Sequence, residues 1–172
     1  SARARPPRRI SEATSPRANG ASGALRLASD RPLVVSSRTW NASAKGTFGA
    51  HLAGMRDDRA VTPGRPGVLP QLKRGPSVRT NVGLTNLGPT PVMAAILLLA
   101  ANGTALGSER LVTLPAGSLV QEDDVFAACG AGDAAIAWAR IEVRTAGGRV
   151  LAYASVIDNA TSDPTIVPAI VP

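Results

Sequence analysis

The sequence predicts an all-β protein, and more specifically an immunoglobulin-like β-sandwich. Three observations support this fold class: many short segments are apolar or alternate between apolar and polar residues, Gly, Pro and Asn separate them, and two distant segments repeat one pattern. The 172 residues suffice for one domain with a core, or for one domain and a fragment of a second. Because aromatic residues make up only 3%, the core must be aliphatic.

The first element is a basic arm at residues 1–20. It holds five of the 19 basic residues and one of the 12 acidic residues, and so supplies four of the seven net positive charges. Three prolines and scarcely any apolar side chain predict that this arm is disordered. The rest of the chain is nearly balanced in charge. We therefore expect no binding of nucleic acid except through the arm.

Residues 21–50 are interpreted as a truncated first β repeat. Within them, the alternating Leu25-Arg-Leu27 and the β-branched run at residues 33–40 predict a hairpin. Residues 51–76 are rich in Gly and Pro, which predicts a connector with one short strand at Val68-Leu69.

Residues 77–168 are interpreted as a complete β-sandwich repeat. Val82 and Leu84 alternate with polar residues, residues 92–100 are wholly apolar, and the Asn102-Gly103 pair that follows is a strong hairpin signal. One helical turn is expected at residues 122–126. The remaining expected strands are at residues 105–114, 118–121, 139–143, 149–158 and 164–167.

The duplicated pattern becomes visible when Asn41 is aligned with Asn159. Leu25-Arg-Leu27 then matches Ile141-Glu-Val143, and residues 33–37 match 151–155. Each copy is therefore expected to end in the same hairpin and exit loop. Because a lone hairpin is marginally stable in water, the first copy should lean on the complete repeat or on another chain, which makes homodimerisation an expectation.

Several segments together resemble a known kind of repeat. They are RTNVGLTNL at residues 79–87, LPAG at 114–117, DVF at 124–126, and YASVIDN at 153–159 with DPT at 163–165. They are similar to β-sandwich repeat modules at the C-terminal ends of large secreted or surface bacterial proteins, and SSRTWN at residues 36–41 resembles the close of a preceding repeat. The resemblance implies immunoglobulin-like modules on the surface of a bacterium or secreted from it. That family is largely uncharacterised and implies no catalytic residue.

The residues themselves offer one weak arrangement for hydrolysis. His51 is the only histidine and precedes Asp57 and Asp58 by six and seven residues, which makes these three the candidate catalytic residues. Ser36, Ser37, Ser43 and Ser77 are the candidate nucleophiles, and nothing in the sequence selects one of them. A loop histidine is more often a solvated side chain, and the chain has no Gly-x-Ser-x-Gly motif.

Metal ligands are equally few. One His and one Cys fall short of the ligands that a zinc ion requires in a single chain, and the lone Cys129 forms no disulfide within it. Calcium is a candidate ion, because carboxylates gather at Glu122, Asp123, Asp124 and Asp133. The simpler interpretation is a set of acids at a helix start.

Two further patterns have ordinary explanations. Asn41, Asn102 and Asn159 each begin a glycosylation sequon but are also common turn residues. Trp40, Trp138 and Tyr153 could stack on a carbohydrate, although Trp40 and Tyr153 lie within apolar runs that favour a packing role.

These observations favour a non-catalytic extracellular module for adhesion, assembly or substrate contact. The expected partner is a second copy or another surface protein, and no confident cofactor follows from the sequence. The longest apolar run, residues 92–101, is half as long as a membrane-spanning helix, so no membrane span is expected. The alternative is a small hydrolase of esters or lactones, assisted by calcium through its effect on a bound water or carbonyl.

Overall fold

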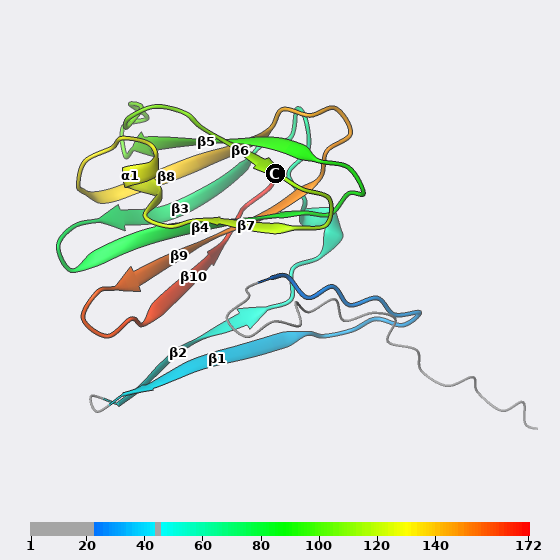
Figure 1. Ribbon diagram of the computed structural model, residues 1–172, viewed down its shortest axis with the longest axis horizontal. Helices are drawn as coiled ribbons and strands as arrows, with labels where there is room; N and C mark the ends of the chain where they lie inside the picture. Colours follow the sequence, from blue (N-terminus) through cyan, green and yellow to red (C-terminus); the bar gives the residue numbers. More distant parts are fainter. Residues whose placement is uncertain (1–22, 44–45) are drawn as a thin grey trace, which may run out of the picture.

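The computed structural model describes residues 23–43 and 46–172, so the basic arm predicted at residues 1–20 lies outside the described residues. Two four-stranded antiparallel sheets pack against each other, and a separate two-stranded hairpin lies beside one of them (Figure 1). The prediction of an all-β sandwich is confirmed. The immunoglobulin-like arrangement of its strands stays a prediction.

The first sheet has the order β3-β8-β5-β6 and the second the order β10-β9-β4-β7. The strands of the first sheet are β3 (Gly67–Arg74), β5 (Val92–Ala100), β6 (Arg110–Leu114) and β8 (Ala134–Val143). Those of the second are β4 (Val78–Asn86), β7 (Leu119–Glu122), β9 (Val150–Asp158) and β10 (Pro164–Pro168). Two short helices are described, the 3₁₀ helix η1 (Asp57–Arg59) and α1 (Val125–Ala128).

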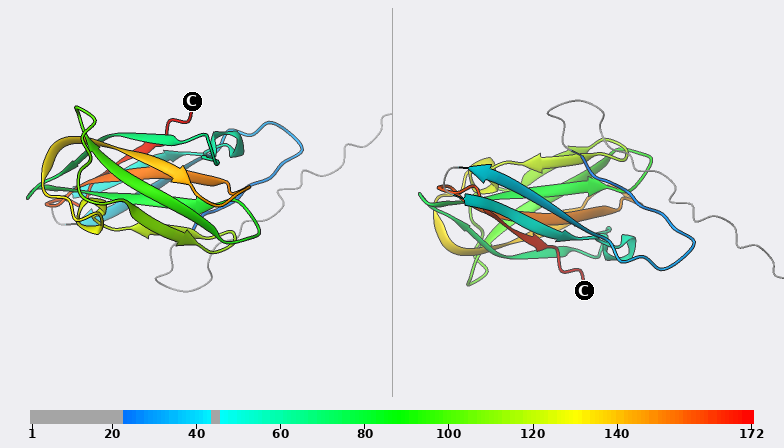
Figure 2. Two further views of the ribbon diagram at one scale, coloured as in Figure 1. Left: turned by 90° about the horizontal axis from the view of Figure 1, so that it is seen from above. Right: turned by 90° about the horizontal axis from the view of Figure 1, so that it is seen from below.

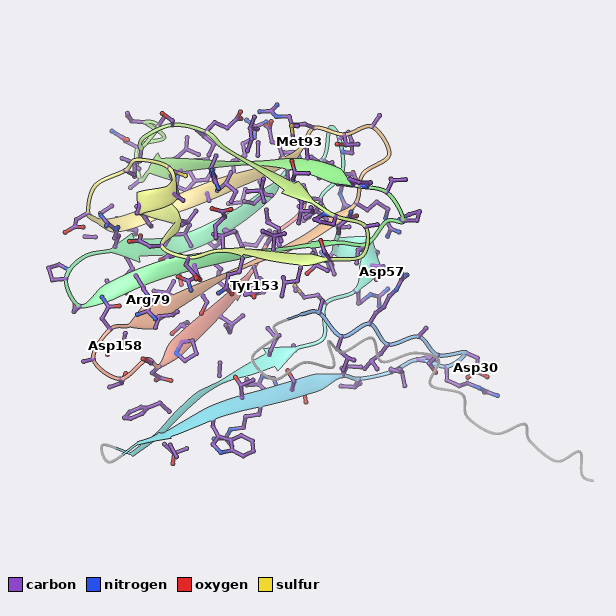
Figure 3. The ribbon with its side chains drawn as sticks, viewed as in Figure 1. Asp30, Asp57, Arg79, Met93, Tyr153 and Asp158 are labelled. Atoms are coloured by element: carbon purple, nitrogen blue, oxygen red, sulfur yellow. The ribbon has the colours of Figure 1, made fainter. Side chains whose placement is uncertain are left out.

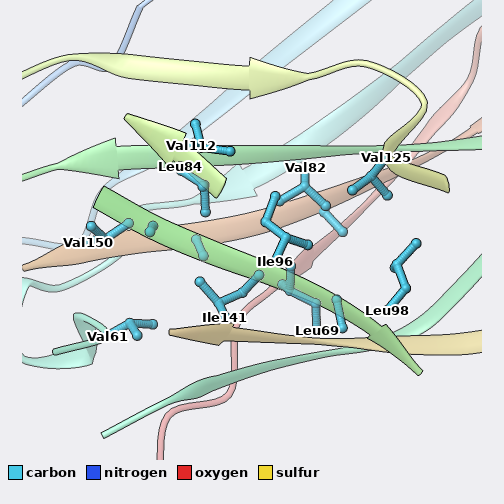
Figure 4. Packing of buried hydrophobic residues seen from close by; sticks show 14 of the residues in the cluster. Val61, Leu69, Val82, Leu84, Ile96, Leu98, Val112, Val125, Ile141 and Val150 are labelled. Carbon is cyan, nitrogen blue, oxygen red and sulfur yellow. The ribbon is translucent and has the colours of Figure 1, made fainter. Parts of the chain in front are cut away.

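The core is aliphatic, as the composition predicts, and lies between the two sheets (Figure 4). Leu69 on β3 and Ile96 on β5 are fully buried against Val82 and Leu84 on β4. Phe126 of α1 is the largest fully buried side chain. Thr80 adds a polar tie between the sheets, because its hydroxyl donates to the carbonyl of Lys73 at 2.7 Å.

The expected pairing of residues 139–143 with 149–158 as one hairpin is wrong. β8 pairs with β3 and β5, whereas β9 pairs with β4 and β10, so the chain crosses between the sheets at residues 144–149. The reason is burial, since nearly every residue of β9 is buried on one face or the other. A strand with two covered faces fits the middle of a sheet, which β9 occupies between β4 and β10.

The first hairpin also differs from the expectation. Its strands are β1 (Ser36–Ser43) and β2 (Gly46–Ala53), and no strand covers residues 25–27. The glycines of β2 hid this strand in the sequence. Gly49 is required there because an added Cβ would lie 2.1 Å from the carbonyl oxygen of Thr39 on β1. Similarly, the predicted connector contains the whole of β3 and not only Val68-Leu69.

The two repeated segments occupy β1 and β9, and each is followed by an antiparallel partner. Their registers differ, because Ser37 lies opposite Leu52 while the matching Ser155 lies opposite Ile166. Their surroundings differ too: β9 is central in its sheet, whereas β1 pairs with β2 alone. The expectation that each copy ends in the same hairpin and exit loop is therefore wrong, and their common origin stays a prediction.

In the view from below in Figure 2, the hairpin lies in front of the sheet that contains β9 and β10. The hairpin thus belongs to a third layer, which lies outside the two sheets of the sandwich. The backbone N–H of Gly49 on β2 donates to Asp163 Oδ1 at 3.1 Å, next to the start of β10. Along β2 the more buried side chains alternate, at Phe48, Ala50 and Leu52, which indicates that one face of the hairpin packs toward the sandwich.

Most strands of the second half match their predictions. β5 and β10 agree closely with the expected ranges, and the Asn102-Gly103 turn leads into β6, with Gly103 at a φ of +85°. In the described parts of the chain, no helix has both the length and the apolar character needed to cross a bilayer.

Candidate functional site

The larger of two hollows described here lies between the hairpin and the sandwich, and we call it the hairpin groove. It is lined by residues 51–56, 59, 151, 152, 166 and 168–171, and its volume is about 510 Å³. β2 and the chain that leaves it form one wall. The other wall is the face of β9 and β10 that points away from the core, together with the segment after β10. This volume lies within the range of small-molecule sites, about 300–1,000 Å³.

The walls of the groove are mainly aliphatic. Leu52 and Met55 come from the hairpin side, and Leu151, Ile166 and Ile170 from the sandwich side. Ile170 is 61% exposed, which is high for an isoleucine. An apolar lining of this kind favours ligands or partners that bring apolar surface.

The ionisable side chains among the described lining residues are all basic. Arg56 and Arg59 lie where the chain passes from the hairpin to the sandwich, and His51 lies on β2. Within the part of the chain that the structure describes, no acidic residue lines the groove. Arg56 binds Asp58 at 2.7 Å, and its hydrogen bonds hold the pKa of that carboxyl below the ordinary value. Arg59 has no salt bridge within the described part of the chain.

The structure does not join the three candidate catalytic residues. His51 is part of β2 and lies opposite Arg38 in the hairpin, rather than in the loop that the sequence predicted. Asp57 accepts a hydrogen bond from Arg26 at 3.1 Å, and Asp58 binds Arg56. In Figure 3, Asp57 lies at the junction between hairpin and sandwich. Across the described residues, no hydrogen bond links His51 to either carboxylate.

The candidate nucleophiles are dispersed. Ser36 and Ser37 begin β1, opposite Ala53 and Leu52, while Ser77 lies in the turn before β4. The side chain of Ser43 is outside the described part. None of the other three serines lines the hairpin groove. Cys129 is buried in the core, away from these serines in the sequence. Burial raises the pKa of its thiol to about 11, so the thiol is a poor nucleophile at neutral pH.

The four acidic residues proposed for calcium are engaged by nitrogen donors. Glu122 binds Arg110 at 3.1 Å, Asp124 and Asp133 bind Arg74 at 3.0 and 3.3 Å, and Asp123 accepts from Asn81 at 2.9 Å. Asp124 also caps α1 by accepting from the backbone of Ala127. In residues 23–43 and 46–172, no group of three or more His, Cys, Asp or Glu side chains is arranged to hold a metal ion.

A polar network that the sequence did not reveal lies on the outer face of the second sheet. Tyr153 donates to Gln121 Oε1 at 3.2 Å, Gln121 donates to Asp123 Oδ1 at 2.8 Å, and Asn81 donates to the same oxygen. Burial, and next the charge of Asp123, raise the pKa of Tyr153. Figure 3 shows Tyr153 over the middle of the sheet. The signal in the sequence was Gly83, whose missing side chain leaves room for the ring.

The three aromatic residues do not form one platform. Trp40 lies on β1 and is 68% exposed. Trp138 lies on β8 of the first sheet and donates to the carbonyl of Ala100 on β5 at 3.0 Å. Two sequon asparagines lie in turns, as expected, although Asn159 also makes a long-range contact. Asn102 accepts from the backbone of Thr104, and Asn159 donates to the carbonyl of Pro76.

A second, smaller hollow of about 340 Å³ lies at the open side of the sandwich between β3 and β10. It is lined by Leu72, Val156 and Val167 from the interior and by Ile136 from β8. Of the described residues that line it, Lys73 alone is charged. We regard it as incomplete closure of the two sheets at their edge strands.

Comparison with known proteins gives this chain no relatives: no family model matches it, and no curated protein or solved structure is significantly similar.

Proposed function

We propose that this chain is a non-catalytic extracellular β-sandwich module for adhesion, assembly or substrate contact, and that strand β1 is its contact element. One observation carries the proposal. β1 is eight residues long and pairs with β2 alone, so its other edge is not part of any described sheet. A free edge of this length is a template for a strand from another chain.

The side chains of β1 support this role. Trp40 is 68% exposed, and large exposed aromatic residues are enriched at protein interfaces. The matching strand β9 has both of its edges filled, by β10 and by β4. A second copy of β1 is a suitable neighbour, because an antiparallel pair centred on Trp40 places Arg38 opposite Ala42 and keeps the two arginines apart.

The test is the oligomeric state in solution, measured by sedimentation equilibrium over a wide concentration range. We expect a concentration-dependent dimer. Trp40→Lys should weaken it by tenfold or more in Kd, because the substitution adds a charge beside the pairing edge. Ile136→Lys is the matched control, since Ile136 is 61% exposed on β8 of the first sheet. A monomer at every concentration would contradict pairing through β1.

The competing proposal is a small hydrolase of esters or lactones. The observation that favours it is that His51 lines a groove. Against it, no serine, threonine, cysteine or tyrosine among the described residues lines that groove, so the described lining offers no hydroxyl or thiol nucleophile. Purified protein should therefore leave a panel of activated esters and lactones intact, with and without calcium. Turnover that His51→Ala abolishes would favour the hydrolase.

The location and the arm complete the proposal. A secreted or cell-surface position in a bacterium is supported by the sequence resemblance. Polyanion binding by the basic arm is a separate, weaker possibility, which deletion of residues 1–20 would test through the loss of salt-sensitive binding to heparin.

A further inference from the structure

The charge and the lining of the hairpin groove together define a class of ligand. Its walls are aliphatic, and its three ionisable lining residues are His51, Arg56 and Arg59. The charge of Arg56 is matched by Asp58 at 2.7 Å. Arg59 is exposed and forms no ion pair among the described residues, although its charge also helps to lower the pKa of Asp58. Arg56 and Arg59 therefore share one nearby carboxylate, and the lining keeps a net positive charge beside an apolar surface. A guanidinium binds a carboxylate strongly because its N–H groups form parallel hydrogen bonds to both oxygens.

We propose that the hairpin groove binds a small amphipathic anion, a single alkyl chain that ends in a carboxylate. The alkyl chain lies against Leu52, Leu151 and Ile166, and the carboxylate binds Arg59. This ligand matches both properties of the groove, whereas a neutral apolar ligand leaves the guanidinium unmatched. The arm at residues 1–20 is a poor occupant because it has five arginines and one glutamate, so its charge has the same sign as the lining. The proposal is independent of pairing through β1.

Three probes of equal chain length separate the contributions of charge and apolar contact. Decanoate and decyltrimethylammonium are titrated into the full-length protein below their critical micelle concentrations, and decanol below its solubility limit, with isothermal calorimetry as the readout. We expect decanoate to bind at one site per chain, decanol at least tenfold more weakly and the cation not at all. Equal affinity for all three probes, or no binding of decanoate, would overturn the proposal. So would binding to anionic vesicles in the absence of binding to monomeric decanoate.

Two substitutions at one exposed position give opposite predictions. Ile170 lines the groove and is 61% exposed, and its backbone N–H and C=O already pair with Val68. The fold should therefore tolerate a charged side chain there. Ile170→Glu should weaken decanoate binding at least tenfold, while Ile170→Lys should preserve or strengthen it. A purely structural effect would change binding in the same direction in both variants and would contradict the proposal.

Arg59 itself is tested against a matched arginine elsewhere. Arg59→Gln should lower decanoate affinity at least tenfold and leave decanol binding unchanged. Arg140→Gln removes the same charge from β8 in the other sheet, where Arg140 pairs with Glu142 at 2.6 Å, and should have no effect. Equal losses in the two variants would show that net charge rather than the groove determines binding, and would overturn the assignment.

Discussion

Asn86 at the end of β4 shows how one side chain can hold a turn. It is 1% exposed, and its amide nitrogen donates to the carbonyls of Thr90, Leu114 and Pro115 at 2.8 to 3.2 Å. Its amide oxygen accepts from the backbone of Gly88. We predict that Asn86→Asp lowers the free energy of unfolding by more than about 2 kcal/mol at pH 7, because an anionic acceptor would face three carbonyl acceptors.

The test is urea denaturation between pH 7 and pH 4. The loss caused by Asn86→Asp should shrink as the pH falls, because protonation restores one donor. Asn102→Asp is the control, since Asn102 is exposed and uses only its amide oxygen, which a carboxylate replaces. Equal losses at both positions would contradict this account of Asn86.

Gly83 is the position where a single methyl group should disturb the polar network of Tyr153. An added Cβ would lie 2.2 Å from Tyr153 Cε1, so the ring would have to move away from Gln121. Gly83→Ala should therefore cost about 1 to 3 kcal/mol of stability. Gly132→Ala is the control, because nothing lies within 4 Å of its added Cβ. Unfolding midpoints in urea measure both, and equal effects would show that the ring has space to adapt.

Cys129 should make stability depend on alkaline pH. Burial raises the pKa of its thiol from 9.0 to about 11, so the unfolded chain loses this proton at a lower pH than the folded chain. The contribution of the protonated thiol to the free energy of unfolding is fully present below pH 9 and is lost as the pH rises from 9 to about 11. Two pKa units correspond to about 2 to 3 kcal/mol.

Cys129→Ala removes that contribution, so the variant should lose less stability than the parent between pH 9 and pH 11. Urea denaturation at a series of pH values measures the difference. The raised pKa of Tyr153 acts in the same direction but is common to both proteins. Parallel pH profiles would contradict a buried, un-ionised thiol.

At the scale of elements, Arg74 ties the end of β3 to the start of α1. It binds Asp124, which caps the helix, and Asp133, which precedes β8. Arg74→Ala should destabilise the protein by about 1 to 2 kcal/mol, because it leaves the partly buried carboxylate of Asp124 and the exposed carboxylate of Asp133 without their cation. The exposed pair of Arg56 provides the comparison, and Arg56→Ala should change the melting temperature very little.

The ion pairs of Arg74 also affect the calcium hypothesis. Because Arg74 and Arg110 already form ion pairs with three of the four carboxylates, millimolar calcium should leave the melting temperature unchanged. A rise in melting temperature with calcium that Asp123→Ala abolishes would instead favour a cation site there.

Strands marked by alternation, by a continuous apolar run or by bounding prolines were predictable from the sequence, whereas β2 was not. β5 is wholly apolar and β10 begins and ends at prolines, so both were found within a residue or two. β2 was missed because Gly46 and Gly49 resemble turn residues, although the close approach of β1 requires one of them. The pairing of β8 and β9 was wrong because adjacency in sequence does not determine which sheet a strand joins.

For the whole molecule, the sandwich should fold without the hairpin. All eight of its strands lie within residues 67–168, and Val61, which is fully buried, follows the hairpin. A chain that begins at residue 55 should keep the β-sheet circular dichroism and a cooperative melt. It should lose decanoate binding, since one wall of the groove is gone. Failure to fold would show that the hairpin is part of the structural core.

The sequence could predict the class of fold but not the hairpin groove. Alternation and turn residues determine strands, and strands with one apolar side must pack in layers. The groove depends on where a separate hairpin rests against β10, a long-range contact with no local pattern. His51 lines it together with Ile166 and Ile170, more than a hundred residues away.

The edges of the strands determine how far any assembly could grow. β3 is interrupted by Pro70 and by a register shift at Gln71, β10 carries Pro164 and Pro168, and β6 and β7 have only five and four residues. The far side of β2 meets Asp163. β1 alone offers a long uninterrupted edge within the described strands. When two copies join through β1, the backbone N–H and C=O groups of one edge pair with those of the other, and no second long edge remains in the described part of the chain. The expected product is therefore a closed dimer and not an extended fibre.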